Sequence, residues 1–531
     1  MTLAGTELSI GSGLFSYRNE PRLYLAPDKQ AGSAVSISLL RLWGAMLCAG
    51  AMALPSPAFA QSSADQDTRL RLDQQMEGQK REIETELLEN ADALDVPTSL
   101  EIDGQTYSVG DNVNDMGKAL YISITRKQWP DVQRFLAAYQ RYPDRDPMLV
   151  HYAEGGLARE GGDLTAAESE YRALLALQAD FLPGQLELAR VLFENHKDRE
   201  ARRAFQDAQA LLVEQGDQAV NVRQTVDVFL HALERRRGWQ GRIAIGPAYS
   251  TNLNQSSASY TCLLEADDGT CLFDRKVPDP IAAAGINFEA TLGRDIPLGG
   301  HHGIRARGLL YGDIYPDHHD YSQTTAIGRV GYRYQSARDT VALSPSFEFG
   351  SLGSSILYAA PGINAEWTHI LSPSATLRLE GTYRDFRYRL AAYERQDGPL
   401  TDISLTAWYS VAPGWTLFGG PDFSAKDTDN PVDSYDQGGV RLGVNKSFGT
   451  DASLLLIGSY RYRRYRAYSE LFAAQRQDDQ FNATAIARFP ALKFAGLVPE
   501  IVVQHTHIES SIDWLYSYDR TSASLRLNHA F

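Results

Sequence analysis

The stretch Ser522–Phe531, SASLRLNHAF, alternates between apolar and polar side chains up to the last residue of the chain. The apolar parity holds Ala523, Leu525, Leu527 and Phe531, and the polar parity holds Ser524, Arg526 and Asn528. A period of two is typical of a strand with one apolar and one polar face, although His529 interrupts the apolar side. Two structures fit this pattern: the last strand of a soluble β-sandwich, or the closing strand of a barrel whose outer face meets lipid.

The amino-acid composition excludes some classes of protein. A net charge of -15 argues against nucleic acid as a partner, because phosphate binding needs a basic surface. A mean hydropathy of -0.32 and 22% charged residues exclude a bundle of apolar membrane helices. They leave a transmembrane barrel open, because only half of each barrel strand is apolar.

The N-terminal part carries an export signal. Arg41 precedes an apolar run, 42–54, which is too short for a permanent membrane anchor. Ala58 and Ala60 then place small residues at the two positions that a signal peptidase reads. We therefore interpret residues 1–60 as a leader whose signal peptide has its core at about 41–60, with cleavage after Ala60.

A polar, charged segment follows at 61–97, and we interpret it as a linker with a solvent-exposed helix. The next region, 98–237, starts with a predicted β-hairpin turning at Asp103-Gly104. Helical periodicity then runs from Met116 to about Arg235.

A repeat of 34 residues lies within the helical region. Five positions, mostly small with one aromatic, recur at this spacing: Gly155, Ala158, Ala167, Tyr171 and Leu174 are followed by Ala189, Leu192, Ala201, Phe205 and Ala208. Thirty-four residues is the period of tetratricopeptide repeats, in which small residues allow paired helices to touch. We predict two good repeats, a degenerate helical pair at 119–142 and a capping helix at 218–235. A plain helical bundle with coincidental spacing is the alternative.

From residue 238 to 531 the period changes to two, which predicts a membrane barrel of fourteen antiparallel strands. The predicted strands are 241–254, 282–296, 301–315, 322–336, 339–353, 354–370, 374–388, 398–411, 415–428, 436–448, 452–466, 478–492, 497–511 and 518–531. Tight turns such as PLGG and FGTD alternate with longer polar loops, as in bacterial outer-membrane barrels. A soluble sandwich has no reason to sort its loops by length, so we expect Phe531 to end the closing strand at the lipid interface.

The two parities of these strands predict a lipid face and a lumen face. The outward parity is apolar with tyrosines toward one end, as in Leu454, Leu456 and Tyr460. An arginine facing lipid costs about 2–4 kcal/mol, so the charged parity should face the lumen. The predicted lumen set is Arg305, Arg307, Arg329, Arg333, Arg378, Glu380, Arg384, Arg441, Arg461, Arg463, Arg488 and Arg526, with Glu289, Glu348 and Glu366. These side chains predict an internal Arg–Glu network, and a polar conduit is the alternative.

The sequence gives little indication of catalysis. It has no nucleophile elbow, phosphate loop or C-x-x-C motif, and we predict neither an enzyme nor a cofactor. The histidines of 317–320 (DHHD) and 505–507 (HTH) are weak metal candidates. Cys262 and Cys271 share the first long loop and are predicted to form a disulfide, since Cys48 leaves with the signal peptide.

Periplasmic tetratricopeptide repeats joined to a fourteen-strand barrel at RRRGWQ resemble the surface lipoprotein assembly modulator (Slam) family of type XI secretion. The resemblance rests on three stretches: TSLEIDGQTYSVGDNVNDMGKALYISITRKQW, the repeat core HYAEGGLAREGGDLTAAESEYRALLALQADFLPGQLELARVLFENHKDREARRAF, and the first strand RIAIGPAYSTNLNQ. It covers nearly all of the mature chain, and its motifs are architectural, so no active-site residues are carried over.

The resemblance implies translocation of protein cargo across the cell outer membrane. The cargo would be surface lipoproteins or secreted haem- or metal-binding proteins, received by the helical domain in the periplasm. Outer-membrane lipid, the barrel assembly machinery and periplasmic chaperones are the other expected partners, and nucleic acid is not. An exopolysaccharide export porin with a periplasmic tetratricopeptide scaffold is the alternative, although such exporters resemble longer repeat arrays and sixteen-strand barrels. A barrel enzyme or a simple porin needs no helical domain.

Overall fold

The structure is a computed structural model, and it describes residues 63–89, 109–214, 219–267 and 269–531. The predicted signal peptide, with Ala58 and Ala60, lies outside these residues, as does the hairpin predicted at Asp103-Gly104. Within the described residues, no helix has both the length and the apolar character needed to cross a membrane.

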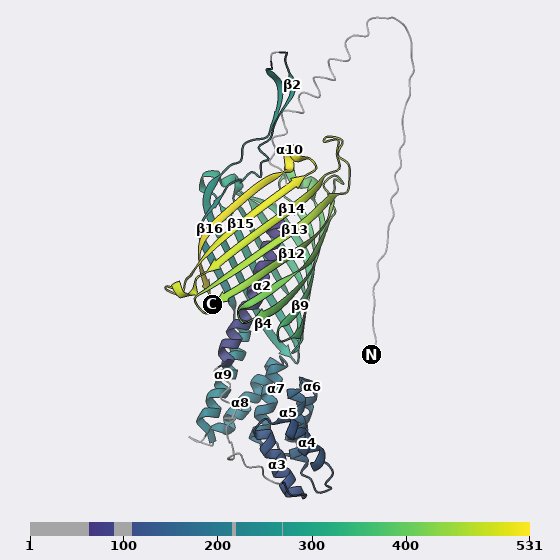
Figure 1. The fold of residues 1–531 in the computed structure, drawn as a ribbon, viewed down its shortest axis with the longest axis vertical. Coiled ribbons are helices and arrows are strands. Elements are labelled where there is room, and N and C mark those ends of the chain that lie inside the picture. The colour runs from purple at the N-terminus through teal and green to yellow at the C-terminus, as the bar shows by residue number, and fades with distance from the viewer. Residues whose placement is uncertain (1–62, 90–108, 215–218, 268) are drawn as a thin grey trace, which may run out of the picture. The chain divides into compact units, whose positions relative to one another are not determined.

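Among the residues described between 113 and 237, seven helices form the helical domain (Figure 1). They are α3 (Val113–Thr125), α4 (Trp129–Tyr139), α5 (Pro147–Glu160), α6 (Leu164–Leu177), α7 (Leu182–Glu194), α8 (Asp198–Glu214) and α9 (Val220–Arg237). Local sequence signals set their ends: the Asp146 side chain accepts a hydrogen bond from the Met148 amide at 2.8 Å, and Pro147 occupies the first helical position. Gly162, with φ of 78°, makes the tight turn between α5 and α6.

The small and aromatic positions of the repeat meet between paired helices. A Cβ on Gly155 would come within 2.9 Å of the Tyr171 ring, so only glycine lets α5 and α6 approach this closely. In the next pair, α7 and α8, Ala189 and Phe205 are fully buried. Phe205 also stacks on Phe229 of α9 at 4.9 Å between ring centroids. Each repeat therefore buries its face against its neighbour, as solenoid repeats do.

Fourteen antiparallel strands form a closed barrel, in which β1 pairs with both β4 and β16. The strands are β1 (Gln240–Ser250), β4 (Ala283–Gly299), β5 (His302–Ile314), β6 (Gln323–Gln335), β7 (Asp339–Leu352), β8 (Ser355–Ser372), β9 (Ala375–Tyr388), β10 (Gly398–Ala412), β11 (Trp415–Lys426), β12 (Tyr435–Phe448), β13 (Ala452–Tyr465), β14 (Gln477–Arg488), β15 (Val498–Ser510) and β16 (Tyr518–Ala530). The predicted fold class, a tetratricopeptide-like helical domain followed by a fourteen-strand barrel, is confirmed.

The two ends of the barrel differ in their connections. We call the end with the β4–β5, β6–β7 and β8–β9 turns the short-turn end, and the opposite end the long-loop end. Short helices occupy four connections: η4 (Pro316–Tyr321), η5 (Ala391–Gln396) and α10 (Asp513–Tyr516) at the long-loop end, and η6 (Pro490–Leu492) at the short-turn end. The strand predicted at 478–492 ends at Arg488 instead, because Pro490 cannot donate a ladder hydrogen bond.

The first long loop contains structure that the sequence reading did not predict. Strands β2 (Tyr260–Glu265) and β3 (Cys271–Lys276) form a separate two-stranded sheet, which projects from the long-loop end (Figure 1). Each of these strands is only six residues long, so the alternation is too short to separate from loop sequence.

Candidate functional site: the occupied barrel lumen

The N-terminal part of helix α2 (Ser63–Glu89) lies inside the barrel, and its last turns extend beyond the barrel toward the helical domain (Figure 1). This corrects the interpretation of 61–97 as a solvated linker: the segment is helical, but Asp67, Arg71 and Asp73 are each at most 6% exposed. The first turn of α2 lies toward the long-loop end, where Tyr311 of β5 donates a hydrogen bond to Asp65 at 2.6 Å. Charged side chains of this part of the helix meet charged side chains of several surrounding strands.

Near its first turns, α2 holds a cluster centred on Glu348 of β7. Arg69 donates two hydrogen bonds to Glu348, at 2.5 and 2.6 Å, and pairs with Asp65 one turn earlier at 2.7 Å. Glu348 also accepts hydrogen bonds from Tyr358, at 2.7 Å, and from Arg384, at 2.7 Å. The buried carboxylate is thus matched by two guanidinium groups and a phenol, which a buried charge requires.

One turn further, Asp67 pairs with Arg461 of β13. The guanidinium of Arg461 is fully buried and donates to Asp67 at 2.6 and 3.1 Å, and to Asp422 of β11 at 2.7 Å. Ser459 donates a further hydrogen bond to Asp67 at 2.6 Å. Arg461 therefore joins the helix to two strands of the barrel wall.

On another side of the helix, Arg71 donates a hydrogen bond to Glu289 of β4 at 3.1 Å. Glu289 also pairs with Arg526 of β16, at 2.7 Å, and Arg526 donates to Glu500 of β15 at 2.8 Å. Glu500 accepts a further hydrogen bond from Arg488 at 3.0 Å. This chain of ion pairs runs from α2 to the strands that close the barrel.

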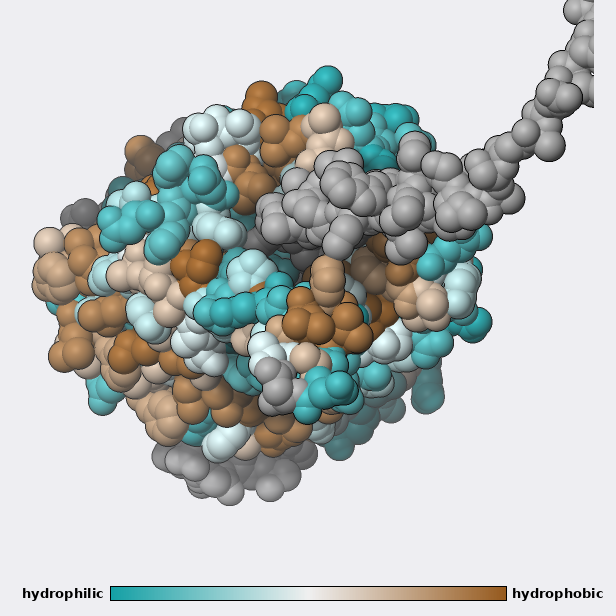
Figure 2. All heavy atoms as spheres, turned by 90° about the horizontal axis from the view of Figure 1, so that it is seen from above, coloured by the Kyte–Doolittle hydropathy of each residue, from teal (hydrophilic) through white to brown (hydrophobic). Residues whose placement is uncertain are grey.

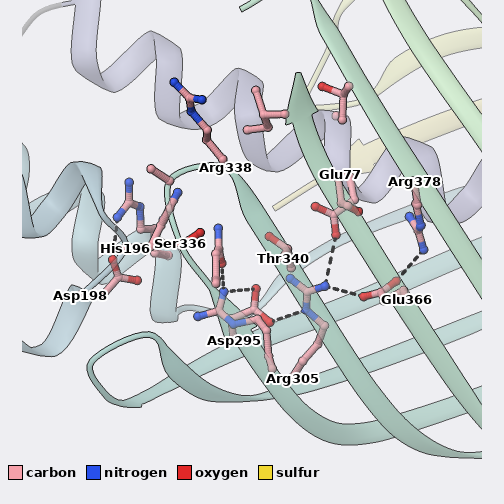
Figure 3. Close-up of a pocket in the computed structure, with 18 of the residues that line it drawn as sticks. Glu77, His196, Asp198, Asp295, Arg305, Ser336, Arg338, Thr340, Glu366 and Arg378 are labelled. Atoms are coloured by element: carbon pink, nitrogen blue, oxygen red, sulfur yellow. Dashed lines mark hydrogen bonds and ion pairs between the residues drawn. The ribbon is translucent and has the colours of Figure 1, made fainter. Parts of the chain in front are cut away.

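The second half of α2 meets an arginine cluster toward the short-turn end. Asp73 pairs with Arg329 of β6 at 3.2 Å and with Arg307 of β5 at 3.8 Å, and Glu77 also pairs with Arg307. In Figure 3, Arg305 lies between Asp295, Glu77 and Glu366, at 3.0, 3.9 and 2.5 Å. Glu77, Asp295, Arg305 and Glu366 line a cavity of about 550 Å³, which also reaches His196 and Asp198 of the helical domain (Figure 3).

Apolar contacts with α2 are few. Leu72 is 1% exposed and packs in a small cluster with Leu309, Tyr311 and Ile327 of the barrel wall. Met76 lies beside Gly293 of β4, and its sulfur would be 3.1 Å from a Cβ at that position. Ion pairs and hydrogen bonds therefore dominate the contacts between the described side chains of the helix and the wall.

The predicted lumen residues face inward. Buried positions belong to Arg305, Arg307, Arg329, Arg333, Arg378, Glu380, Arg384, Arg441, Arg461, Arg463 and Arg526, together with Glu289, Glu348 and Glu366. Arg488 is half-buried. The outward parity is exposed where the protein would meet lipid: Leu456 is 41% exposed and Leu310 39%. The main chain of Phe531 exchanges hydrogen bonds with Gly241 of β1 at 2.9 and 3.0 Å, where β16 meets β1.

The helical domain contacts both the wall and the lumen helix. At the short-turn end, Arg199 of α8 donates to the Leu298 carbonyl at 2.7 Å, and the Gly300 amide donates to Glu200 at 2.8 Å. Leu88, in the last turn of α2, packs against the core of the helical domain. Within that domain, burial would raise the pKa of Glu168, but hydrogen bonds from Lys197 and Arg172 bring it below its ordinary value.

The remaining candidate groups lie apart from the lumen helix. Cys262 and Cys271 form a disulfide between β2 and β3. His505 and His507 are exposed and hydrogen-bond to Thr521 and Asp519, while the DHHD segment forms η4.

A separate group that could hold a metal ion lies in the helical domain. Ligand atoms of His151, Glu154 and Glu170 lie within 4.8 Å of one another. These side chains are half-exposed, and His151 is already hydrogen-bonded to Glu170 at 2.8 Å.

The sequence reading missed the contribution of α2, whose lumen-facing groups are Asp65, Asp67, Arg69, Arg71, Leu72, Asp73 and Glu77. One signal was available: the predicted lumen set held many more arginines than acids, so further anions had to come from residues outside that set. Strand residues such as Asp295, Asp422 and Glu500 supply some of them, and α2 supplies others. The acidic residues of 65–77 were the nearest unassigned source on the periplasmic side of the predicted barrel.

A closed barrel with apolar outer side chains, a charged interior and a helical-repeat domain defines an outer-membrane protein of the repeat-plus-barrel class. Residues 239–531 match the family model described as surface lipoprotein assembly modifier, and residues 105–205 match its N-terminal TPR repeats. The chain belongs to the surface lipoprotein assembly modifier family.

Two relatives illustrate the similarity. The Hemophilin secretion modulator of Acinetobacter baumannii is 36% identical over 484 residues, covering 88% of this chain and 96% of that protein. The Surface lipoprotein assembly modifier 2 of Haemophilus influenzae is 26% identical over 421 residues, covering 78% and 83%. The toluene transporter TodX of Pseudomonas putida, a solved structure, gives a TM-score of 0.30 at 9% identity over 55% of this chain and 89% of that one, which is too low to inform function.

Proposed function

We propose that this protein delivers specific exported proteins across the outer membrane, with the helical domain receiving cargo in the periplasm. The cargo class follows the names of the relatives: a secreted protein of the hemophilin kind or a surface lipoprotein. The observation that carries the proposal is a barrel whose lumen is occupied by helix α2 of the same chain. A passive pore has no need of such a helix, whereas a translocator must stay closed between cargo molecules.

The contacts of α2 are suited to a removable plug. Ion pairs and hydrogen bonds such as Asp67–Arg461 and Arg69–Glu348 hold the helix, with Leu72 as the main fully buried apolar contact. When the helix moves, water and the charged groups of a passing polypeptide can solvate the exposed guanidinium groups. An apolar interface would instead expose hydrophobic surface at a cost of about 25 cal/mol per Å².

The helix is also connected to the domain proposed to bind cargo. Leu88 packs on the core of the helical domain, while Asp65 lies at the other end of the lumen, near Tyr311. Movement within the helical domain can therefore pull on α2 along its axis. Signal cleavage after Ala60 would leave a free chain end just before Ser63, so the helix could enter or leave the lumen end first.

The lengths of the connections between strands indicate how the barrel is oriented in the outer membrane. The helical domain contacts the turn at Leu298 and Gly300, at the short-turn end of the barrel. Short turns face the periplasm in bacterial barrels, so the helical domain would lie in the periplasm and the β2–β3 sheet outside the cell.

A reversible lock on α2 tests the proposal. Cysteines replace Leu72 and Leu309, which share one cluster, in a chain whose Cys262 and Cys271 are serines. Oxidation should stop release of a co-expressed hemophilin or display of a co-expressed surface lipoprotein, and reduction should restore it. The two single-cysteine variants, treated identically, are the matched controls. Continued release from a fully cross-linked protein contradicts the plug, and loss of polysaccharide export without any effect on protein cargo supports the exporter alternative.

A further inference from the structure

The sheet formed by β2 and β3 exposes large apolar side chains at the long-loop end. Seen from this end, the surface of the described residues has hydrophobic residues beside hydrophilic ones (Figure 2). The exposed side chains are Tyr260, Leu263, Leu264, Leu272 and Phe273, each between 51% and 59% exposed. The pairing of β2 with β3 is irregular at Leu263 and Leu272, and no described element buries the large apolar side chains of this sheet. Neither face of this sheet therefore covers a core.

The sheet is nevertheless held in a fixed place. A two-stranded hairpin is only marginally stable by itself, and the Cys262–Cys271 disulfide joins its strands. At its base, the guanidinium of Arg275 stacks 3.8 Å from the Trp514 ring of α10. Ser257 and Ser259 each donate a hydrogen bond to the Trp514 carbonyl at 2.6 Å. An apolar, braced and projecting sheet is an interaction surface rather than a disordered loop.

The charged residues of the β2–β3 sheet indicate which kind of molecule would bind to it. Glu265, Asp267 and Asp274 are exposed, and none of them makes an ion pair with the residues that the structure describes. The two cations of the hairpin are engaged, Arg275 with Trp514 and Lys276 with Asp279 at 3.5 Å. The surface is therefore apolar and acidic, which is unfavourable for an anionic lipid headgroup and complementary to basic side chains.

The hydrogen-bonding edges indicate how a partner would bind. Among the described residues, β2 and β3 pair only with each other, so each strand has a second edge with main-chain groups available. An extended peptide can add to such an edge as a third strand, with its main chain giving affinity and its side chains giving specificity.

We propose that the β2–β3 sheet binds an extended, apolar and basic segment of a protein emerging from the barrel. This inference rests on the proposed function, since it takes the translocated protein as the source of that segment. Binding would hold the emerging chain outside the membrane and oppose its return. An acidic, disulfide-braced sheet does this without a cofactor or a covalent step.

The test uses the purified full chain and a fluorescent peptide of alternating valine and lysine, measured by anisotropy. The peptide should bind the native chain, and a valine–glutamate peptide should bind at least about tenfold more weakly. The variant with Leu263→Ser and Leu272→Ser should lose about tenfold in affinity, since two apolar contacts are removed. The matched control is Leu471→Ser, an equally exposed leucine in another loop. Heat-modifiable gel mobility shows whether each variant has a folded barrel.

Equal binding by the double variant and the control overturns the inference, as does preferential binding of lipopolysaccharide or self-association through the sheet. A cell assay separates this failure from failure of the proposed function. If the native chain releases cargo and the folded double variant releases it equally well, the inference is wrong and the function stands. If the native chain releases no protein cargo, the proposed function itself is wrong.

Discussion

Asp67 of α2 and Arg461 of β13 are joined by two hydrogen bonds, at 2.6 and 3.1 Å, where the guanidinium is fully buried. Asp67→Lys places two cations together in the lumen. Removing one partner of a buried pair costs about 3–5 kcal/mol, so the docked state of α2 should be disfavoured by roughly a hundredfold to a few thousandfold. Planar-bilayer recordings should show frequent open-channel events that the native chain shows rarely.

The control for this change is Asp317→Lys, which makes the same substitution in an exposed loop outside the lumen. It should leave the conductance unchanged, and both variants should keep the heat-modifiable mobility of a folded barrel. A silent Asp67→Lys channel would mean that α2 does not control the pore.

Strand parity makes a second prediction. Leu456 lies on the lipid face of β13, so Leu456→Arg should cost about 2–4 kcal/mol and reduce the amount of folded barrel in the outer membrane. Leu456→Phe is the matched control, because it keeps an apolar side chain at the same depth. Membrane fractionation with gel mobility measures both, and normal insertion of the arginine variant would place this residue away from lipid.

The barrel could be predicted because its determinants are local. A strict period of two and recurrent turn residues define strands such as β13, where Leu456 and Arg461 alternate between lipid and lumen. The predicted strands were wrong where a single residue interrupts the two-residue alternation, or where a strand is too short to show it. Pro490 ended β14 early, and the six-residue strands β2 and β3 carried too little pattern.

The location of α2 could not be predicted from its own sequence. A helix whose charged residues are not confined to one face is ordinarily predicted to be exposed to solvent, because water usually solvates such a surface. Here the partners are Glu289, Glu348 and Arg461, which come from strands more than two hundred residues away. Asp67 is buried because the closed barrel surrounds it, and a closed barrel depends on contacts between residues that are far apart in the sequence.

The helical domain makes a third prediction. A methyl group at residue 155 would lie within 2.9 Å of the Tyr171 ring, so Gly155→Ala should destabilise that domain by about 1–3 kcal/mol. Circular dichroism at helical wavelengths should show an earlier melting transition, with the barrel transition unchanged. Glu160→Ala, at an exposed position of the same helix, should leave both transitions in place. A common shift of both transitions would mean that the two domains unfold together.

The last prediction concerns Gly78, in the half of α2 that faces the cavity beside the helical domain. A Cβ at this position would meet nothing within 4 Å, so alanine fits without a clash. Glycine is about 1 kcal/mol less favourable than alanine inside a helix, so Gly78→Ala should stiffen α2 and favour its docked state. Cargo release should slow by roughly fivefold if the helix must bend or unwind at this point to leave the lumen. Gly458→Ala is the control, because it also has open space around its Cβ but lies on the outer face of β13. Pulse-labelled cargo in the medium or on the cell surface gives the rate. Faster release from the Gly78→Ala variant would show that a more rigid helix leaves the lumen more readily, contrary to a plug that opens by bending.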